Sequence, residues 1–248
     1  MRTLVLALVA SMMPGLAAAQ APPAPGTAAP GPPPRWERKA ELSLVSAGGN
    51  TDTQTLGAGA SVTYRPGAWT TEARAALLRS SANDVLTAKS FLADLREARA
   101  LTPRLEVFGR FGYLSDPFAG IDRRSTIDAG AGYKLLTGPV HALRVDAGLG
   151  YSREARVTGE DLSFPLANFG TGYKYQISKT ADLSDAAILT LPLDNGDAWR
   201  FGNAFALAAT VTRVLSVKLS HDVKFNNSPV PLFKKTDRLV SVALVARF

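Results

Sequence analysis

From Trp36 to Phe248 the sequence alternates between apolar residues and polar or small residues in one segment after another. The stretch after residue 142 shows the pattern, with Leu143, Val145, Ala147, Leu149 and Tyr151 alternating with Arg144, Asp146, Gly148, Gly150 and Ser152. Successive side chains of a β-strand point to opposite faces, so a period of two predicts strands with one apolar face and one polar face. The same pattern recurs in several separate segments, which makes it a property of the whole region.

Turns rich in helix- and strand-breaking residues and longer polar loops divide this region into twelve predicted strands. Their predicted bounds are 39–47, 53–65, 69–80, 87–100, 105–115, 124–136, 141–154, 162–176, 181–191, 199–211, 214–225 and 237–248. Two stretches, Thr71–Ser80 and Thr87–Leu101, also suit helices by propensity because they contain alanine and charged residues. We predict strands there as well, because the hairpin spacing would otherwise break.

The predicted strand count is even, and short turns alternate with longer connections. A tilted strand needs about 9–11 residues to cross a bilayer. Outer-membrane barrels join such strands by short periplasmic turns and longer outer loops. The pattern therefore predicts an all-β fold, a transmembrane antiparallel β-barrel of about twelve strands with both termini in the periplasm. A soluble periplasmic β-protein is the alternative, since alternation also occurs in soluble sheets.

The predicted last strand, Leu239–Phe248, ends on an apolar aromatic residue. One face of it carries Val240, Val242, Leu244, Ala246 and Phe248, whereas Val245 is the exception on the other face. Chain termini usually fray in water, but a barrel that pairs its last strand with its first has a reason to end in this way. We interpret Phe248 as an assembly signal that the barrel-assembly machinery reads during insertion.

The first residues indicate an exported protein. A positive start, the apolar run Leu4–Val9 and the small residues Ala17–Ala19 predict a cleaved signal peptide over 1–19. Residues 20–37, rich in Ala, Pro and Gly, predict a periplasmic tether and leave 38–248 for the barrel. The chain has no Cys, so neither a lipid anchor nor a disulfide is expected. The predicted location is the outer membrane of a Gram-negative cell, with membrane lipid as a partner.

The formal net charge is +7, yet the basic residues are scattered singly along the alternating strands. Without a Lys/Arg cluster or an aromatic stacking motif, binding to nucleic acid is not expected. The charges fall instead on the polar face of the strands, which points into the lumen of a membrane barrel. The residues predicted to line the lumen are Glu106, Arg110, Asp128, Lys134, Arg144, Asp146, Lys174, Lys218, Asp222 and Lys224.

Glycines share this predicted inner face, among them Gly130, Gly132, Gly148 and Gly150. They remove side-chain volume from the lumen, which suits an open and slightly cationic passage for ions or small solutes. They also let a small barrel bend, and the inner charges would then pair into a closed plug. The sequence leaves both interpretations open. It favours a porin-like, narrow passive conduit or a structural component of the envelope.

Candidate catalytic groups are sparse. The two histidines are His141, at the start of a predicted strand, and His221, on the predicted lipid face. Ser220 and His221 are neighbours on opposite faces, which is a poor geometry for a Ser–His pair. Asn50 and Asp52 lack the later Glu of an EF-hand loop. We expect no enzyme activity, no cofactor and no metal, with a barrel enzyme acting at the lumen or outer loops as the alternative.

Three loop segments carry a further signal. They are Gly49–Thr53 (GNTDT), Phe118–Arg124 (FAGIDRR) leading into Gly130–Tyr133 (GAGY), and Phe233–Asp237 (FKKTD). In this order they resemble the YdiY-like family of salt-induced outer-membrane proteins, a domain of unknown function, and the resemblance spans 38–248. It implies an outer-membrane β-barrel with a link to salt or osmotic stress. It implies no particular biochemical activity.

Overall fold

The computed structural model describes residues 34–47 and 53–247. Its strands are β1 (Trp36–Ala47), β2 (Thr53–Tyr64), β3 (Trp69–Ala82), β4 (Val85–Ala100), β5 (Leu105–Asp116), β6 (Ile121–Thr137), β7 (His141–Arg156), β8 (Leu162–Gln176), β9 (Ala181–Pro192), β10 (Arg200–Thr210), β11 (Leu215–Asn226) and β12 (Thr236–Arg247). Two short 3-10 helices, η1 (Pro117–Ala119) and η2 (Gly196–Ala198), lie in loops. The predicted signal peptide, most of the predicted tether and Phe248 lie outside the described residues.

The predicted strands agree closely with the observed ones. Every strand exists, and each observed bound lies within three residues of the predicted one. The largest differences are at β1, which begins at Trp36 instead of residue 39, and at β6, which begins at Ile121 instead of residue 124. Trp36 pairs with Tyr64, so the barrel starts two residues inside the segment predicted as tether.

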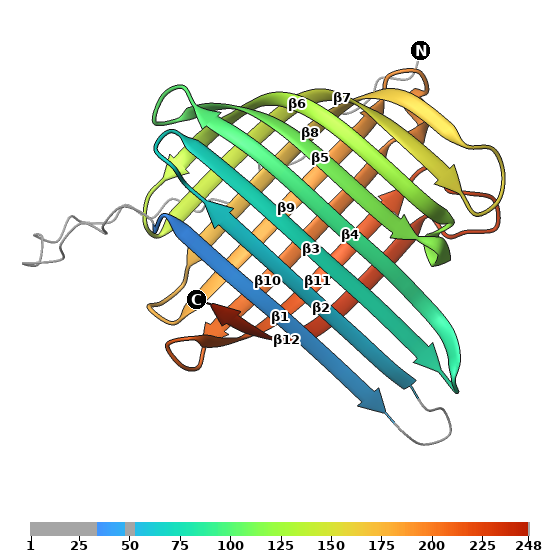
Figure 1. The fold of residues 1–248 in the computed structure, drawn as a ribbon, viewed down its shortest axis with the longest axis horizontal. Helices are drawn as coiled ribbons and strands as arrows, with labels where there is room; N and C mark the ends of the chain where they lie inside the picture. Colours follow the sequence, from blue (N-terminus) through green and yellow to red (C-terminus); the bar gives the residue numbers. More distant parts are fainter. Residues whose placement is uncertain (1–33, 48–52, 248) are drawn as a thin grey trace, which may run out of the picture. The chain divides into compact units, whose positions relative to one another are not determined.

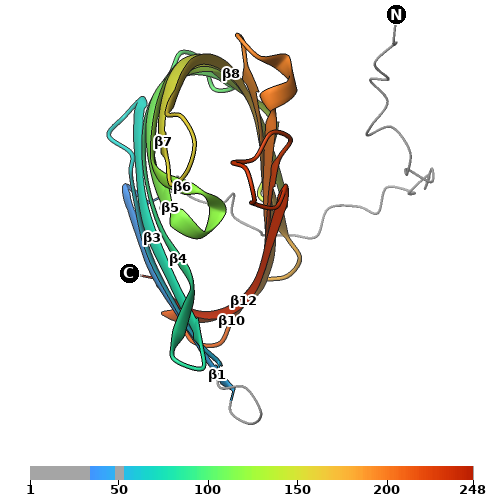
Figure 2. The same cartoon turned by 90° about the vertical axis from the view of Figure 1, so that its right-hand side faces the viewer.

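The strands close into an antiparallel barrel in which each strand pairs with its sequence neighbours (Figure 1). Closure occurs at β1, which pairs with β2 on one side and with β12 on the other, where Leu42 lies opposite Leu244. Figure 2 looks into the resulting ring. A closed sheet has no free edge, so its strands satisfy each other's backbone groups, as spanning a bilayer requires. The predicted twelve-stranded barrel is thus confirmed.

The two stretches with helix propensity form β3 and β4, which pair with each other and with β2 and β5. Their side chains alternate as in the other strands: Leu77 and Leu95 are exposed, whereas Arg96 is buried. Hydrogen-bonded partners on both sides outweigh the local helix propensity of these segments. Among the residues that the structure describes, no helix is long and apolar enough to cross a membrane.

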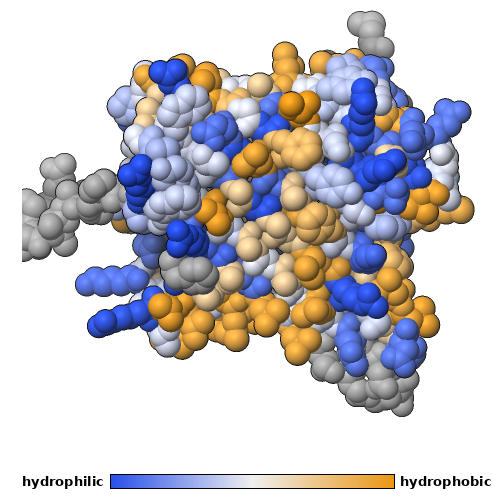
Figure 3. All heavy atoms as spheres, viewed as in Figure 1, coloured by the Kyte–Doolittle hydropathy of each residue, from blue (hydrophilic) through white to orange (hydrophobic). Residues whose placement is uncertain are grey.

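The two faces of the barrel differ sharply in polarity. The outer face carries exposed apolar side chains such as Leu44, Leu149 and Val240, whereas the inner face buries polar ones such as Ser152 and Glu154. Figure 3 shows apolar side chains across the middle of one outer face and strongly hydrophilic ones toward its left and right ends. A soluble domain buries its apolar side chains, so this inverted arrangement matches a sheet that faces lipid.

The two ends of the barrel have different connections. One end, here called the turn end, carries the short turns between paired strands, together with the start of β1 and the end of β12. The other, the loop end, carries the connections 117–120, 157–161, 193–199 and 227–235. The loop-end connection between β3 and β4 is only Asn83-Asp84, with φ of 48° and 62°. It is shorter than predicted, because Asn and Asp tolerate the left-handed conformation of a two-residue hairpin turn.

Candidate functional site

The ten residues predicted to line the lumen lie on the inner face of the barrel. They are Glu106, Arg110, Asp128, Lys134, Arg144, Asp146, Lys174, Lys218, Asp222 and Lys224, and each is an even number of residues from a buried residue of its own strand. Cross-strand register aligns them in rows, with Arg110 opposite Asp128 and Lys134 opposite Arg144. Their role in conduction stays a prediction.

Five inner side chains near the turn end form what we call the turn-end cluster: Arg96, Glu106, Lys134, Arg144 and Asp146. Glu106 lies 2.6 Å from Arg96 and 3.3 Å from Lys134. Asp146 lies 3.1 Å from Arg144 and 3.7 Å from Arg96. Arg96 is anchored over the ring of Phe108 at 4.6 Å and reaches from β4 to β7. The cluster therefore pairs three cations with two carboxylates along β4–β7.

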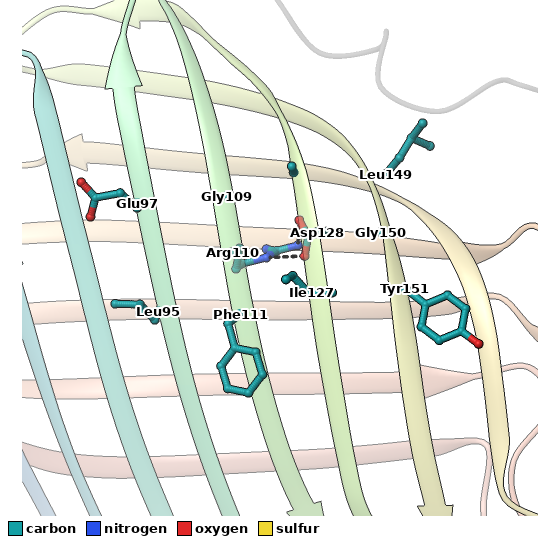
Figure 4. Close-up of a pocket in the computed structure, with 11 residues that line it drawn as sticks. Leu95, Glu97, Gly109, Arg110, Phe111, Ile127, Asp128, Leu149, Gly150 and Tyr151 are labelled. Atoms are coloured by element: carbon teal, nitrogen blue, oxygen red, sulfur yellow. Dashed lines mark hydrogen bonds and ion pairs between the residues drawn. The ribbon is translucent and has the colours of Figure 1, made fainter.

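Arg110 and Asp128 form a second inner pair, between β5 and β6. Arg110 donates from Nε and Nη2 to the two carboxyl oxygens of Asp128 at 3.0 and 3.1 Å. The Asp128 side chain is only 1% exposed, and that of Arg110 is 27% exposed. Figure 4 shows the two side chains pointing toward each other while Phe111 and Tyr151 point away. This bidentate geometry is the strongest form of a carboxylate–guanidinium contact.

Outside this pair lies a shallow depression of about 530 Å³ on the outer face of β4–β7 (Figure 4). Small residues, Gly109 and Ala129, are part of its lining, together with large apolar ones such as Phe111 and Leu149. Glu97 also lines it and accepts a hydrogen bond from Thr71 at 2.6 Å. Its apolar lining on the lipid-facing side of the sheet is typical of a surface that contacts acyl chains.

A further group of inner side chains lies at the loop end, and we call it the loop-end cluster: Arg124, Glu154, Arg156 and Arg200. The Glu154 carboxylate lies 2.6 Å from Arg124 and 2.9 Å from Arg156. Arg200, three strands away on β10, reaches the same carboxylate at 2.9 Å. None of these four residues is among the ten predicted from the sequence. The available signal for Arg124, Glu154 and Arg200 was their place at predicted strand ends, whereas Arg156 lay in a predicted loop.

The loop after β5 and the loop after β11 come from opposite sides of the ring and fold over its opening (Figure 2). Gly120, after η1, has a φ of 81°, and a Cβ added there would lie 2.8 Å from Cβ of Val230. Val230 is only 2% exposed, and Asp116 pairs with Lys224 at 3.1 Å between the same two sides. A cavity of about 220 Å³, here called the vestibule, lies between these loops and the barrel wall.

The remaining predicted residues are on β8 and β11. Lys218 of β11 pairs with Glu41 of β1, so this ion pair spans β12, which closes the barrel against β1. Lys174 and Asp222 make no ion pair within 4.0 Å in the part of the chain that the structure describes. Lys174 is thus an inner cation that is not held in an ion pair among the described residues, which distinguishes it from Lys134 and Lys218.

Neither histidine forms a hydrogen bond with a Ser or Thr hydroxyl among the described residues. His141 shares a hydrogen bond of 2.8 Å with the Tyr173 hydroxyl and stacks on Tyr175 at 4.7 Å. His221 faces outward, whereas Ser220 faces inward and contacts the Ser241 hydroxyl at 2.8 Å. Over residues 34–47 and 53–247, no three His, Cys, Asp or Glu side chains are grouped in a way that could hold a metal ion. The poor Ser–His geometry expected from the sequence is confirmed.

Comparisons with known proteins agree with this architecture. Residues 40–248 match the family described as "Protein of unknown function, DUF481". The chain belongs to this family. The uncharacterized protein YdiY of Escherichia coli (strain K12) is 24% identical over 212 residues, which cover 84% of this chain and 82% of that protein. The resemblance seen in the loop motifs is therefore confirmed.

Two solved barrels share the fold at low sequence identity. The NanC porin is 11% identical with a TM-score of 0.50, covering 85% of this chain and 98% of that one. The translocator domain of the autotransporter NalP from Neisseria meningitidis is 14% identical with a TM-score of 0.51, covering 88% and 90% of the two chains. At this level of identity the likeness concerns the fold alone.

Proposed function

We propose that this protein is an outer-membrane β-barrel that forms a narrow passive conduit for ions and small solutes. The observation that carries the proposal is the closed barrel with an apolar outer face and a charged inner face. A bilayer would cover the outer face, and an aqueous path would hydrate the inner charges. The short turns and both described chain ends then lie in the periplasm, and lipid and the barrel-assembly machinery are the partners.

Conductance across a planar bilayer tests the proposal. The refolded chain is expected to produce discrete current steps in symmetric potassium chloride. Under a potassium chloride gradient, Lys174→Glu is expected to shift the reversal potential toward cation selectivity, because it reverses the charge of an inner side chain that forms no ion pair among the described residues. Arg38→Glu, on the outer face of β1, is the matched control and is expected to leave selectivity unchanged. Absence of any current above that of the bare membrane would refute the conduit.

A structural role in the envelope is the second candidate. It is favoured by the contact between Gly120 and Val230 and by the Asp116–Lys224 pair, which join opposite sides of the ring. We also propose that the protein acts under salt or osmotic stress, as the family resemblance implies. A deletion strain is expected to grow less well after a salt upshift and to recover with the restored gene. Equal growth of the two strains would argue against this role.

A further inference from the structure

Three arginines of the loop-end cluster share a single carboxylate. Arg124, Arg156 and Arg200 all contact Glu154, whose side chain is 1% exposed. The arginine side chains themselves are only 17%, 14% and 11% exposed. The cluster therefore carries two positive charges in excess in a place with little access to water. Burying like charges together is costly unless another negative group compensates them.

The surrounding residues that the structure describes supply only part of that compensation. Asp161 accepts a hydrogen bond from the Arg156 backbone N–H at 3.2 Å, and counting it still leaves one positive charge in excess. The vestibule is also lined by Lys224, Lys234 and Lys235, against Asp116 and Asp237. One of these lysines, Lys224, is paired with Asp116. The cavity as a whole is thus positive.

Arg124 and Arg200 both line the vestibule, together with Thr126, Ser152 and Thr190. Arg200 is held with its guanidinium over the ring of Phe164 at 5.3 Å, which fixes its plane. Its Nε is buried and has no hydrogen-bond partner among the described residues. The cavity of about 220 Å³ corresponds to roughly seven water volumes. That space suits a small solute rather than an oligomer.

We propose that the vestibule binds a small oxyanion, a phosphate or carboxylate group, against Arg124 and Arg200. Planar guanidinium groups bind such oxygens in pairs. The bound anion neutralises the excess charge that Glu154 leaves. The turn-end cluster is a poorer site, because Glu72 lies 3.9 Å from Arg96 and, with Glu106 and Asp146, balances all three of its cations. The anion enters the vestibule along the conduit proposed above, so the site rests on that proposed function.

Binding is tested with the refolded full chain in detergent micelles by titration calorimetry. The probes are inorganic phosphate and succinate, with erythritol as a neutral control. Saturable binding of either anion is expected, and stronger binding of one identifies the preferred oxyanion. Arg200→Gln is expected to weaken binding about tenfold. Lys174→Gln, an inner cation on another part of the wall, is the matched control and is expected to leave binding unchanged.

Arg200→Gln must first show the heat-modifiable migration of a folded barrel. If it does not, Lys235→Gln takes its place. Lys235 is exposed and also lines the vestibule, so this variant is also expected to weaken anion binding. Equal weakening by Lys174→Gln, or no saturable binding of either anion to the wild-type chain, would overturn the site. Conductance of the same preparation separates the two ideas. Current without anion binding refutes the site and keeps the conduit, whereas binding without current refutes the conduit and keeps the site.

Discussion

The pair between Arg110 and Asp128 offers a sharp test of how the inner charges contribute to stability. Asp128→Asn keeps the shape of the side chain and removes its charge. The Arg110 guanidinium then faces an amide that offers one acceptor oxygen instead of two. Because Asp128 is 1% exposed, water cannot replace the lost oxygen from its side of the contact.

The expected cost follows from burial. Removing one partner of a fully buried pair typically costs about 3–5 kcal/mol, because the other charge is left without compensation. Arg110 is 27% exposed and can regain some hydration, and the Asn retains one acceptor. We therefore expect Asp128→Asn to lower the free energy of unfolding by about 2–3 kcal/mol.

A matched control lies on neighbouring strands. Asp94 pairs with Arg74 at 2.6 Å on the same inner face, but Arg74 is 60% exposed. Asp94→Asn is therefore expected to cost only about 0–1 kcal/mol, as exposed ion pairs do. The free energy of unfolding of both variants is measured by urea titration of the refolded barrel, with tryptophan fluorescence as the signal. Equal losses for the two variants would refute the argument that burial decides the contribution.

Three further perturbations separate the two faces and the ends of the barrel. Gly130→Ala places a Cβ against the carbonyl of Ala147, so it is expected to reduce heat-modifiable folding, whereas Gly172→Ala meets nothing within 4 Å and is expected to fold normally. Leu149 is 66% exposed on the outer face, and Leu149→Arg is expected to lower the free energy of unfolding in a bilayer by up to about 2–4 kcal/mol. An unchanged free energy of unfolding would show that this residue does not face lipid. Deletion of Phe248 is expected to leave export intact and lower the amount in the outer membrane, and unchanged levels on fractionation would exclude it as an assembly signal.

The fold was predictable from the sequence because strand periodicity is a local signal. Leu149 and Asp146 reveal their opposite faces from spacing alone, and the closed ring follows from the number and length of such strands. The ends of strands were less predictable. Trp36 lies in the segment predicted as a tether, and only its pairing with Tyr64 assigns it to β1. That pairing depends on a strand about 28 residues later in the sequence, in keeping with the non-local contacts of sheets.

The candidate site was only partly predictable, because clusters of inner charges depend on which strands barrel closure brings together. Arg110 and Asp128 lie on adjacent strands, so alternation was enough to place both on the inner face. Arg200 and Glu154 come from strands that are not neighbours, and nothing in their local sequence shows that they meet. The contact of Gly120 with Val230 has the same origin, since it joins loops from opposite sides of the ring.

The distribution of these contacts bears on whether the barrel is a passage or a plug. The turn-end cluster, with Arg96 and Glu106, comes from β4–β7, so its ion pairs run along one part of the wall. At the loop end, by contrast, the Asp116–Lys224 pair joins β5 to β11, six strands apart in a ring of twelve. Among the described residues, the ion pair that joins strands from opposite sides of the ring is therefore at the loop end. A solute would meet its main obstacle there, directly above the three arginines, so this is where conduction through the barrel is expected to be controlled.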